Sequence, residues 1–298
     1  MSRFEHRFVA MGGPCRLRLD CEGDGQAQAV FNMAEQEVER LEARYSRFRE
    51  NSLVSRINRA AGGGEAVPID SETHGLLNYC DTLYRESEGL FDITSGCLRQ
   101  AWDFRSGKLP GQDQLTELLS LVGWATVEWD ESCIRLPREG MEIDFGGCVK
   151  EYAADSVANM LQQQGITHAL VDFAGDIVTL GEQEDGYPWQ VGIRHPRERA
   201  NAVAQVPLRD LALASSGDYE RCIELEGQRY SHILDPRTGW PAQGLVAVSV
   251  IADQCLVAGS TATIAMLKPR DIALEWLDSL GLPWLAVDDE LGCHGTIA

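Results

Sequence analysis

The spacing of hydrophobic residues in the first third of the chain predicts one strand and two helices. Apolar and polar residues alternate over 8–21, as in a strand with one buried face. Over 27–45 the apolar residues recur every three or four positions with glutamates between them, which predicts an amphipathic helix. A second helix is predicted over 73–88, where Gly89 ends it.

Short strand-like runs dominate the rest of the chain. Residues 127–136 predict a hairpin, and a helix is predicted over 152–164 with Gly165 as its stop. Two further helices are predicted over 255–267 and 271–280. Further strands are predicted at 169–173, 189–194, 221–225 and 246–251, and near Trp284. This mixture indicates an α+β or mixed α/β fold, and no Gly-x-Gly-x-x-Gly follows a predicted strand to suggest a Rossmann site.

The composition is that of a globular protein without a membrane helix. Of the 298 residues, 44% are hydrophobic and 24% are charged, and this length allows one large domain or two. No apolar run approaches the roughly 18 residues that a membrane helix needs. Residues 1–7 carry charges with no apolar run behind them, so no secretory signal is expected unless a leader was removed. The nine cysteines include no Cys-x-x-Cys pair, which predicts reduced thiols and a cytoplasmic protein.

The net charge of −20 narrows the range of partners. Nucleic acid and anionic membranes carry the same sign of charge, so nonspecific binding to either is not expected. A site for an anionic ligand would have to bring its own positive charge, helix dipole or metal ion.

The segment 232–241, His-Ile-Leu-Asp-Pro-Arg-Thr-Gly-Trp-Pro, is the most informative motif. An Asp followed by Pro favours a type I turn, and Gly tolerates the unusual dihedral angles that follow it. Such a turn would carry His232, Asp235, Arg237 and Thr238 on one rigid corner. The alternative is an ordinary turn at a strand end with solvated charges, and His232 could equally be a core histidine.

A second motif, over 144–155, places two glycines directly before a predicted helix. Gly146 and Gly147 would let a ligand approach main-chain N–H groups, and a helix N-terminus favours an anion. Lys150 could add a cation, and Asp144 would lie at the mouth of the site. The alternative is a tight turn from a strand into a helix.

Three further polar segments are individually weak signals. They are Phe91-Asp92-Ile93-Thr94, Ser215-Ser216-Gly217-Asp218-Tyr219, and a Ser-Arg-Phe-Arg-Glu-Asn-Ser run over 46–52. Each is also typical of a polar loop or a solvated helix end.

The five segments, taken in order, resemble the motifs of the ApbE family, the FAD:protein FMN transferases. The family pattern begins with Met-Gly-Thr and Ser-x-Phe/Tyr-Arg-x-x-Ser, and continues with Phe-Asp-x-Thr and Asp-x-Gly-Gly-x-x-Lys-Gly-Tyr-Ala-x-Asp. It ends with Thr-Ser-Gly-Asp-Tyr and His-Ile-x-Asp-Pro-x-Thr-Gly. The matches run from Met11 to about Leu267, which is most of the chain.

The resemblance implies one unit over 1–298, built from two α/β lobes related to the T-fold, with FAD between them. It leaves open where one lobe ends and the other begins. The residues that it places around the flavin nucleotide are Met11, Phe48, Phe91, Asp92, Asp144, Lys150, Ser216, Gly217, Asp218 and Thr238. His232 would be the base near the attacking hydroxyl, and Asp235 and Arg237 complete the catalytic candidates.

The resemblance also implies the reaction and its partners. A Ser or Thr hydroxyl of an acceptor flavoprotein attacks the FMN-side phosphorus of FAD, and AMP leaves. Charge builds on the phosphoryl oxygens, so positioning and a cation such as Mg²⁺ are needed. The family holds magnesium through a main-chain carbonyl, here that of Gly147, and through an Asp and a Thr on the late buried helix, of which Thr263 is present.

Several departures from the family pattern lie near the phosphate end. Gly259 stands where the family has the metal-binding Asp, Glu151 replaces a Gly, and Gly13 replaces a Thr. An Asn-x-Gly-Gly-Asp segment reads Asp-Phe-Ala-Gly-Asp over 172–176. Magnesium usually needs one or two carboxylates, so another one, such as Asp176 or Asp144, would have to complete the site.

Four functions stay open at this point. The first is an active transferase with a soluble acceptor, and the second is an FAD-binding relative that serves as a carrier or interaction protein. The third is a hydrolase that cleaves FAD to FMN and AMP. The fourth is a structural or partner-binding protein without a ligand.

Overall fold

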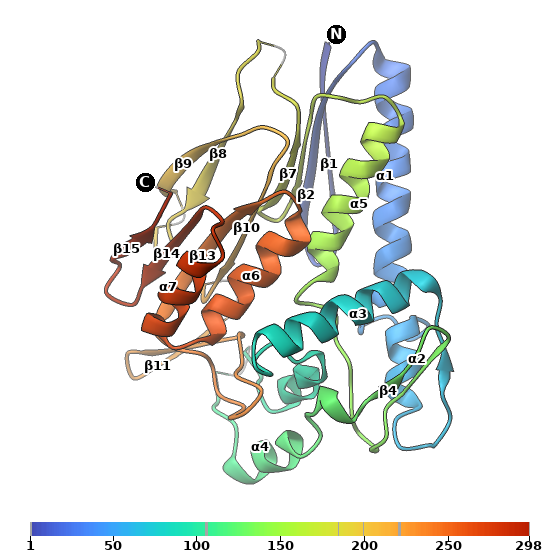
Figure 1. The fold of residues 1–298 in the computed structure, drawn as a ribbon, viewed down its shortest axis with the longest axis vertical. Coiled ribbons are helices and arrows are strands. Elements are labelled where there is room, and N and C mark those ends of the chain that lie inside the picture. Colours follow the sequence, from blue (N-terminus) through green and yellow to red (C-terminus); the bar gives the residue numbers. More distant parts are fainter. Residues whose placement is uncertain (1, 105–106, 184, 199, 220–221, 298) are drawn as a thin grey trace.

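An eight-stranded antiparallel sheet forms the centre of the molecule. The computed structural model describes residues 2–104, 107–183, 185–198, 200–219 and 222–297. The strand order is β1-β2-β6-β7-β10-β13-β14-β15, and every neighbouring pair is antiparallel (Figure 1). The strands are β1 Ser2–Ala10, β2 Gly13–Cys21, β6 Ala169–Phe173, β7 Asp176–Leu180, β10 Ala212–Gly217, β13 Leu245–Ala252, β14 Trp284–Asp288 and β15 Cys293–Gly295.

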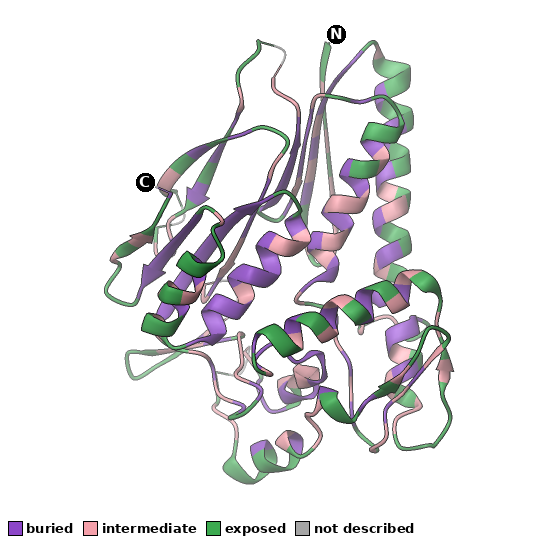
Figure 2. Cartoon of the chain, in the orientation of Figure 1, coloured by how far each residue is buried: buried purple, intermediate pink, exposed green. Residues whose placement is uncertain are grey.

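Helices cover one face of this sheet. They are α1 Asp24–Tyr45, α5 Val149–Gln163, α6 Cys255–Leu267 and α7 Arg270–Ser279. Helix α5 lies between α1 and α6 and packs against both (Figure 1). The inner sides of α1 and α5 are buried and their outer sides exposed, whereas α6 is buried on nearly every side (Figure 2). The small residues of α6, such as Ala258 and Ala262, allow this close approach.

A smaller, mostly helical region lies at one end of the sheet. Its elements are α2 Leu53–Arg59, α3 Ser71–Glu86, the 3-10 helices η1 Ile93–Gln100 and η2 Trp124–Thr126, α4 Gln112–Leu119, and the short strands β3 Val67–Pro68, β4 Glu128–Trp129 and β5 Cys133–Arg135. Two ribbons complete the fold, namely β8 Trp189–Arg194 with β9 Ala202–Leu208 and β11 Cys222–Leu225 with β12 Gln228–Ser231. The predicted α+β class is confirmed.

Most of the predicted elements are present with small shifts of their ends. The strands predicted over 169–173 and 189–194 and the helix over 255–267 have the observed bounds. The hairpin over 127–136 forms as β4 and β5, and Gly165 follows α5 with a φ of +79°. Arg221, the first residue of the strand predicted over 221–225, lies outside the described residues.

The single strand predicted over 8–21 is wrong. Residues Ser2–Ala10 and Gly13–Cys21 form two strands of one hairpin, with Ala10 paired to Gly13 across a two-residue turn. β1 is an edge strand of the sheet, and Phe4, Phe8 and Ala10 on its inner face are only partly buried against the core. The alternation continues on both sides of the two-residue turn, so the pattern over 8–21 did not reveal the break between the two strands.

All nine cysteines are free thiols, as predicted. Six of them are buried, Cys133 and Cys222 are half-buried, and Cys293 is exposed. Cys80 Sγ lies 3.8 Å from Cys148 Sγ. Burial raises the pKa of Cys15 to about 11 and that of Cys97 to about 12, which keeps these thiols protonated near neutral pH. None of the described helices combines the length and apolar character required to cross a membrane.

We expect Leu19→Ala to destabilise the protein by about 2–5 kcal/mol, because it leaves a cavity in the core. Leu19 lies in β2 and is 0% exposed. Val9→Ala in the paired strand is the matched control, because Val9 is 82% exposed, and its effect should stay within about 0.5 kcal/mol. Urea unfolding followed by circular dichroism measures both, and similar losses in the two variants would contradict the expected packing.

Candidate active site

The turn between β1 and β2 forms one wall of a large cleft. Met11 and Gly12 have φ angles of +52° and +76°, as a two-residue type I′ turn requires. The neighbouring turn between β6 and β7 has the same character, with φ angles of +56° at Ala174 and +100° at Gly175. A Cβ on Gly13 would lie 2.8 Å from the Cβ of Ala174, so the two turns meet without room for a larger residue at position 13.

The loop after α1 carries an aromatic ring on the cleft wall. Phe48 is 76% exposed although it is a large hydrophobic residue, and it lines the cleft. The guanidinium carbon of Arg47 lies 4.7 Å from the centre of the Phe48 ring. Arg47 also forms an ion pair with Asp144, whose Oδ1 accepts a 2.9 Å hydrogen bond from the Gly146 N–H. Through these contacts Arg47 and Asp144 connect the loop that carries Phe48 to the segment that contains Gly146.

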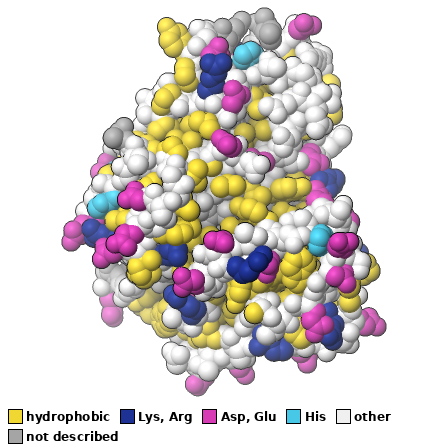
Figure 3. All heavy atoms as spheres, in the orientation of Figure 1, with side chains coloured by type: hydrophobic (Ala, Val, Ile, Leu, Met, Phe, Trp, Pro, Cys, Tyr) yellow, Lys and Arg dark blue, Asp and Glu magenta, His cyan; other side chains and the backbone are white. Residues whose placement is uncertain are grey.

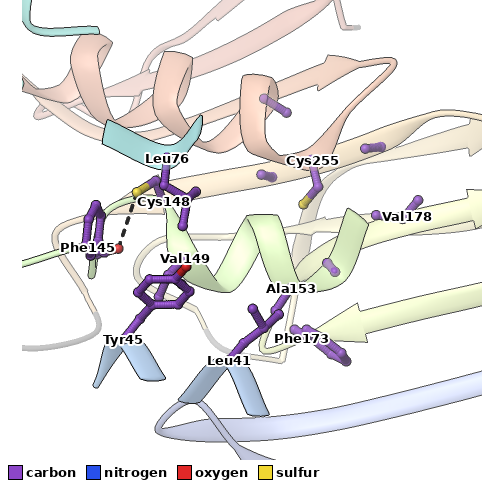
Figure 4. Close-up of a cluster of buried hydrophobic side chains, with 14 of the residues drawn as sticks. Leu41, Tyr45, Leu76, Phe145, Cys148, Val149, Ala153, Phe173, Val178 and Cys255 are labelled. Atoms are coloured by element: carbon purple, nitrogen blue, oxygen red, sulfur yellow. Dashed lines mark hydrogen bonds between the residues drawn. The ribbon is translucent and has the colours of Figure 1, made fainter. Parts of the chain in front are cut away.

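The two-glycine segment is fixed by the core on both sides. Phe145 and Cys148 flank it, are fully buried, and point into a hydrophobic cluster with Tyr45 of α1 (Figure 4). The N–H of Val149 donates to the Phe145 carbonyl at 2.9 Å, which begins helix α5. The glycines therefore present main chain to the cleft at a helix N-terminus, where an anion is favoured.

Phe91 and Asp92 reach the cleft from the beginning of η1. A Cβ on Gly147 would lie 3.2 Å from the Phe91 ring, so ring and glycine segment are in close contact. Asp92 caps η1: it accepts hydrogen bonds from the Thr94 N–H at 2.7 Å and from the Trp124 N–H at 3.1 Å. Burial raises the pKa of the Asp92 carboxyl, and these hydrogen bonds oppose the shift.

Lys150 lies among carboxylates at the first turn of α5. Its ammonium forms an ion pair with Asp176, which is 2% exposed, and lies 3.8 Å from Oε1 of Glu151. It also donates to the Phe173 carbonyl at 3.4 Å. The cation predicted at this place is therefore present, and it already neutralises a buried carboxylate.

The facing helix, α6, contributes a hydroxyl and a glycine. Thr263 lines the cleft, and its Oγ1 lies 2.8 Å from the hydroxyl of Ser216. Gly259, one turn earlier, has no side chain, and a Cβ placed there would lie 2.5 Å from Cγ of Glu151. Asp155 fixes α6 against α5, since its carboxylate accepts from the N–H groups of Cys255 at 2.8 Å and Leu256 at 2.9 Å.

The end of β10 brings Ser216 and Gly217 to the cleft but turns Asp218 aside. A Cβ on Gly217 would lie 2.2 Å from the Tyr219 ring, so only glycine fits there. Asp218 forms a two-oxygen ion pair with Arg197, with N–O distances of 2.6 and 2.8 Å, and is not among the described residues that line the cleft. Its predicted role at the nucleotide is not supported by this geometry.

The turn over 232–241 reaches the cleft only with its beginning. His232 lines the cleft, whereas Asp235, Arg237 and Thr238 are not among its described lining residues. The Asp235 carboxylate accepts from the Arg237 N–H at 2.8 Å and from its guanidinium at 2.8 and 3.0 Å. Sequence proximity had suggested that all four side chains face one ligand. Here the aspartate and arginine stabilise the turn itself.

A cluster of aromatic residues holds this turn against the helical region. The indole N–H of Trp102 donates to the Gly239 carbonyl at 2.8 Å. The rings of Trp102 and Trp240 are 5.3 Å apart in an edge-on arrangement, and Tyr230 lies beside both. The position of His232 is thus set by packing between two distant segments.

The cleft has a volume of about 2310 Å³ and is positively charged relative to the rest of the chain. Its described lining contains eight Lys or Arg residues against six Asp or Glu residues, in a protein with a net charge of −20. On the face shown in Figure 3, by comparison, acidic and basic side chains are interspersed. The cationic residues that sequence reasoning missed are Arg7, Arg16, Arg18, Arg99 and Arg194, whereas Arg47 and Arg49 belong to the candidate segment over 46–52. The alternation over 8–21 placed Arg16 and Arg18 away from the core, but nothing in it indicated a ligand.

Side chains alone do not form a metal centre in the part of the chain that the structure describes. No group of three or more His, Cys, Asp or Glu side chains is arranged there to hold an ion. A cation at the phosphate end would need main-chain, hydroxyl or ligand oxygens in addition to a carboxylate.

We expect Lys150→Met to lower the free energy of unfolding by about 3 kcal/mol, because it leaves the Asp176 carboxylate buried without its cation. Replacing that carboxylate as well, in Lys150→Met/Asp176→Asn, should recover most of the loss. Urea unfolding of the two single variants and the double variant measures the coupling. Additive effects would show that the ion pair does not stabilise the fold.

The comparisons with known proteins agree with this geometry. A model of the ApbE family matches residues 11–285. An FAD:protein FMN transferase of Klebsiella pneumoniae (strain 342) is 30% identical over 259 residues, covering 85% of this chain and 78% of the relative. The FAD:protein FMN transferase of Escherichia coli (strain K12) is 31% identical over 247 residues, covering 80% of this chain and 70% of the relative. The crystal structure of the ApbE protein from Thermotoga maritima superposes with a TM-score of 0.90 at 27% identity, covering 99% of this chain and 97% of the other. The chain belongs to the ApbE family.

Proposed function

We propose that this protein is an FAD:protein FMN transferase. The observation that carries the proposal is that the Gly146–Gly147 main chain, the Met11 turn and His232 line one cleft. At about 2310 Å³ the cleft exceeds the roughly 300–1,000 Å³ of ordinary ligand pockets, which leaves room for a dinucleotide and a segment of a second protein. The similar proteins from Klebsiella pneumoniae and Escherichia coli carry the same activity in their names.

The diphosphate of FAD would lie at the N-terminus of α5. There the N–H groups of the glycine segment and the positive end of the helix dipole favour an anion. The excess of Arg and Lys around the cleft attracts the same ligand in an otherwise acidic protein. The flavin ring would contact Phe48 and Met11, since an exposed aromatic ring on a cleft wall offers a flat surface for stacking.

In the reaction, a Ser or Thr hydroxyl of the acceptor attacks the phosphorus on the FMN side. The new oxygen–phosphorus bond forms as the bond from this phosphorus to the bridging oxygen of the diphosphate breaks. The bridging oxygen leaves as part of the phosphate of AMP. His232, exposed on the cleft wall, would accept the hydroxyl proton. The main-chain amides near Gly147 would stabilise the charge on the phosphoryl oxygens.

Mg²⁺ is part of the proposal, and the residues present fit it. The Gly147 carbonyl, the Thr263 hydroxyl and the diphosphate oxygens are the hard oxygen ligands that Mg²⁺ prefers, and one carboxylate should complete them. Bound there, the ion would neutralise charge on the phosphoryl group. Asp144 is engaged by Arg47 and Asp176 by Lys150, so neither is free to supply that carboxylate.

The acceptor is proposed to be a flavoprotein with a Ser or Thr modification site. The nine free thiols, most of them buried, support a reducing compartment, so we place the enzyme in the cytoplasm with a soluble acceptor.

The test combines the protein with FAD, MgCl₂ and the acceptor flavoprotein of a curated relative. Flavin fluorescence that stays on the acceptor in a denaturing gel, with release of AMP, is the expected result. AMP release without labelled acceptor would identify a hydrolase. FAD binding without either product would identify a carrier, and no FAD binding would rule out all three.

We expect His232→Asn to slow FMN transfer by about 10²–10⁴-fold, because the base that accepts the hydroxyl proton is removed. The Kd for FAD, measured by quenching of flavin fluorescence, should stay unchanged. His74→Asn, in α3 and outside the described lining of the cleft, is the matched control and should transfer FMN at the parent rate. Unchanged transfer by His232→Asn would remove His232 from the mechanism.

A further inference from the structure

Glu151 has an unusual environment for a carboxylate. It lies in the first turn of α5 and is only 8% exposed. Its Oε2 is buried and receives no hydrogen bond from any of the described residues, while its Oε1 lies 3.8 Å from Nζ of Lys150. A buried carboxylate oxygen without a partner is costly, unless a cation or a ligand binds it.

Glu151 lines the same cleft as two suitable oxygen ligands for a metal ion. Glu151 and Gly147 are four residues apart at the beginning of α5, and Glu151, Gly147 and Thr263 all line the cleft. On α6, Thr263 follows Gly259 by four residues, so both belong to the same face of that helix. The Glu151 side chain lies where a side chain on Gly259 would begin, so its carboxylate lies beside this face of α6.

Glu151 occupies the space that a side chain at position 259 would fill. A Cβ built on Gly259 would lie 2.5 Å from Cγ of Glu151, 3.0 Å from its Oε1 and 3.1 Å from its Cδ. A carboxylate carried by residue 259 and the carboxylate carried by residue 151 therefore exclude one another. The family pattern has Asp at the position of Gly259 and Gly at the position of Glu151. In this chain the carboxylate is on residue 151 and the glycine is residue 259.

We propose that Glu151 is the carboxylate ligand of the divalent cation in this protein, supplied from α5 instead of α6. The proposal rests on the proposed function, because the diphosphate of FAD completes the coordination. From the sequence we expected the metal site to be weakened, because Gly259 replaces an aspartate. With Glu151 as a ligand, the site keeps one carboxylate. The exchange of Gly and carboxylate between two touching positions preserves both the charge and the available volume.

Three variants test this assignment, with Mn²⁺ as the probe. Free Mn²⁺ is measured by electron paramagnetic resonance while MnCl₂ is titrated into the FAD-saturated protein. Glu151→Gln keeps the shape but loses the charge, and should raise the Kd for Mn²⁺ by about tenfold or more. Gly259→Asp alone should not tighten binding, because its Cβ overlaps the Glu151 side chain. Glu151→Gly/Gly259→Asp should bring the Kd back to within about threefold of the parent, as expected for coupled neighbours.

Glu117→Gln is the matched control, since Glu117 is exposed on α4 and outside the described lining of the cleft. An unchanged Kd in Glu151→Gln overturns the proposal, and so does a larger loss in Asp144→Asn or Asp176→Asn. Failure of the parent to bind Mn²⁺ overturns it as well.

FAD binding without metal, followed by flavin fluorescence, is measured separately. If FAD binds but Glu151→Gln leaves the Kd for Mn²⁺ unchanged, the assignment fails and the proposed function stands. If FAD does not bind at all, the proposed function fails first.

Discussion

The packing of the first turn of α5 into the core is the constraint on which the rest of the site depends. Phe145 and Cys148 are fully buried on either side of the glycine pair, so the glycine main chain has no freedom to leave the cleft wall (Figure 4). Asp155, further along the same helix, caps the N-terminus of α6 and so sets where Thr263 lies. One helix thus positions the glycine segment of the proposed anion site, the cation Lys150 and the facing hydroxyl together.

The charge distribution of the chain follows from the same arrangement. A protein with a net charge of −20 repels a diphosphate at long range, yet the described lining of the cleft beside the glycine pair contains more cationic than acidic side chains. Part of this positive charge is neutralised within the protein, because Lys150 forms an ion pair with Asp176 and Arg47 forms one with Asp144. The helix N-terminus and a bound cation would then supply the remaining attraction for the phosphates.

Four of the departures from the family pattern occur as two pairs of neighbouring residues. Gly259 faces Glu151, and Gly13 faces Ala174, where a Cβ would lie 2.8 Å from the alanine Cβ. In each pair the family pattern has the larger residue at the position where this chain has glycine, and glycine where this chain has the larger residue. Steric exclusion explains the coupling, because neither contact has room for two larger side chains. Taken alone, Gly259 in place of Asp suggests a weakened metal site, whereas each pair of changes taken together conserves volume.

The sequence by itself determined the local structure and identified several of the residues that line the cleft. The apolar spacing over 27–45 predicted helix α1, and the glycine pair before α5 indicated a candidate anion site, because periodicity and backbone freedom are properties of neighbouring residues. Only the tertiary structure decided which distant segments meet. It separated β1 from β2, paired Asp235 with Arg237 within their own turn, and placed Glu151 against Gly259. A hydrophobic pattern shows which face of an element is buried, but it does not specify which other element covers that face.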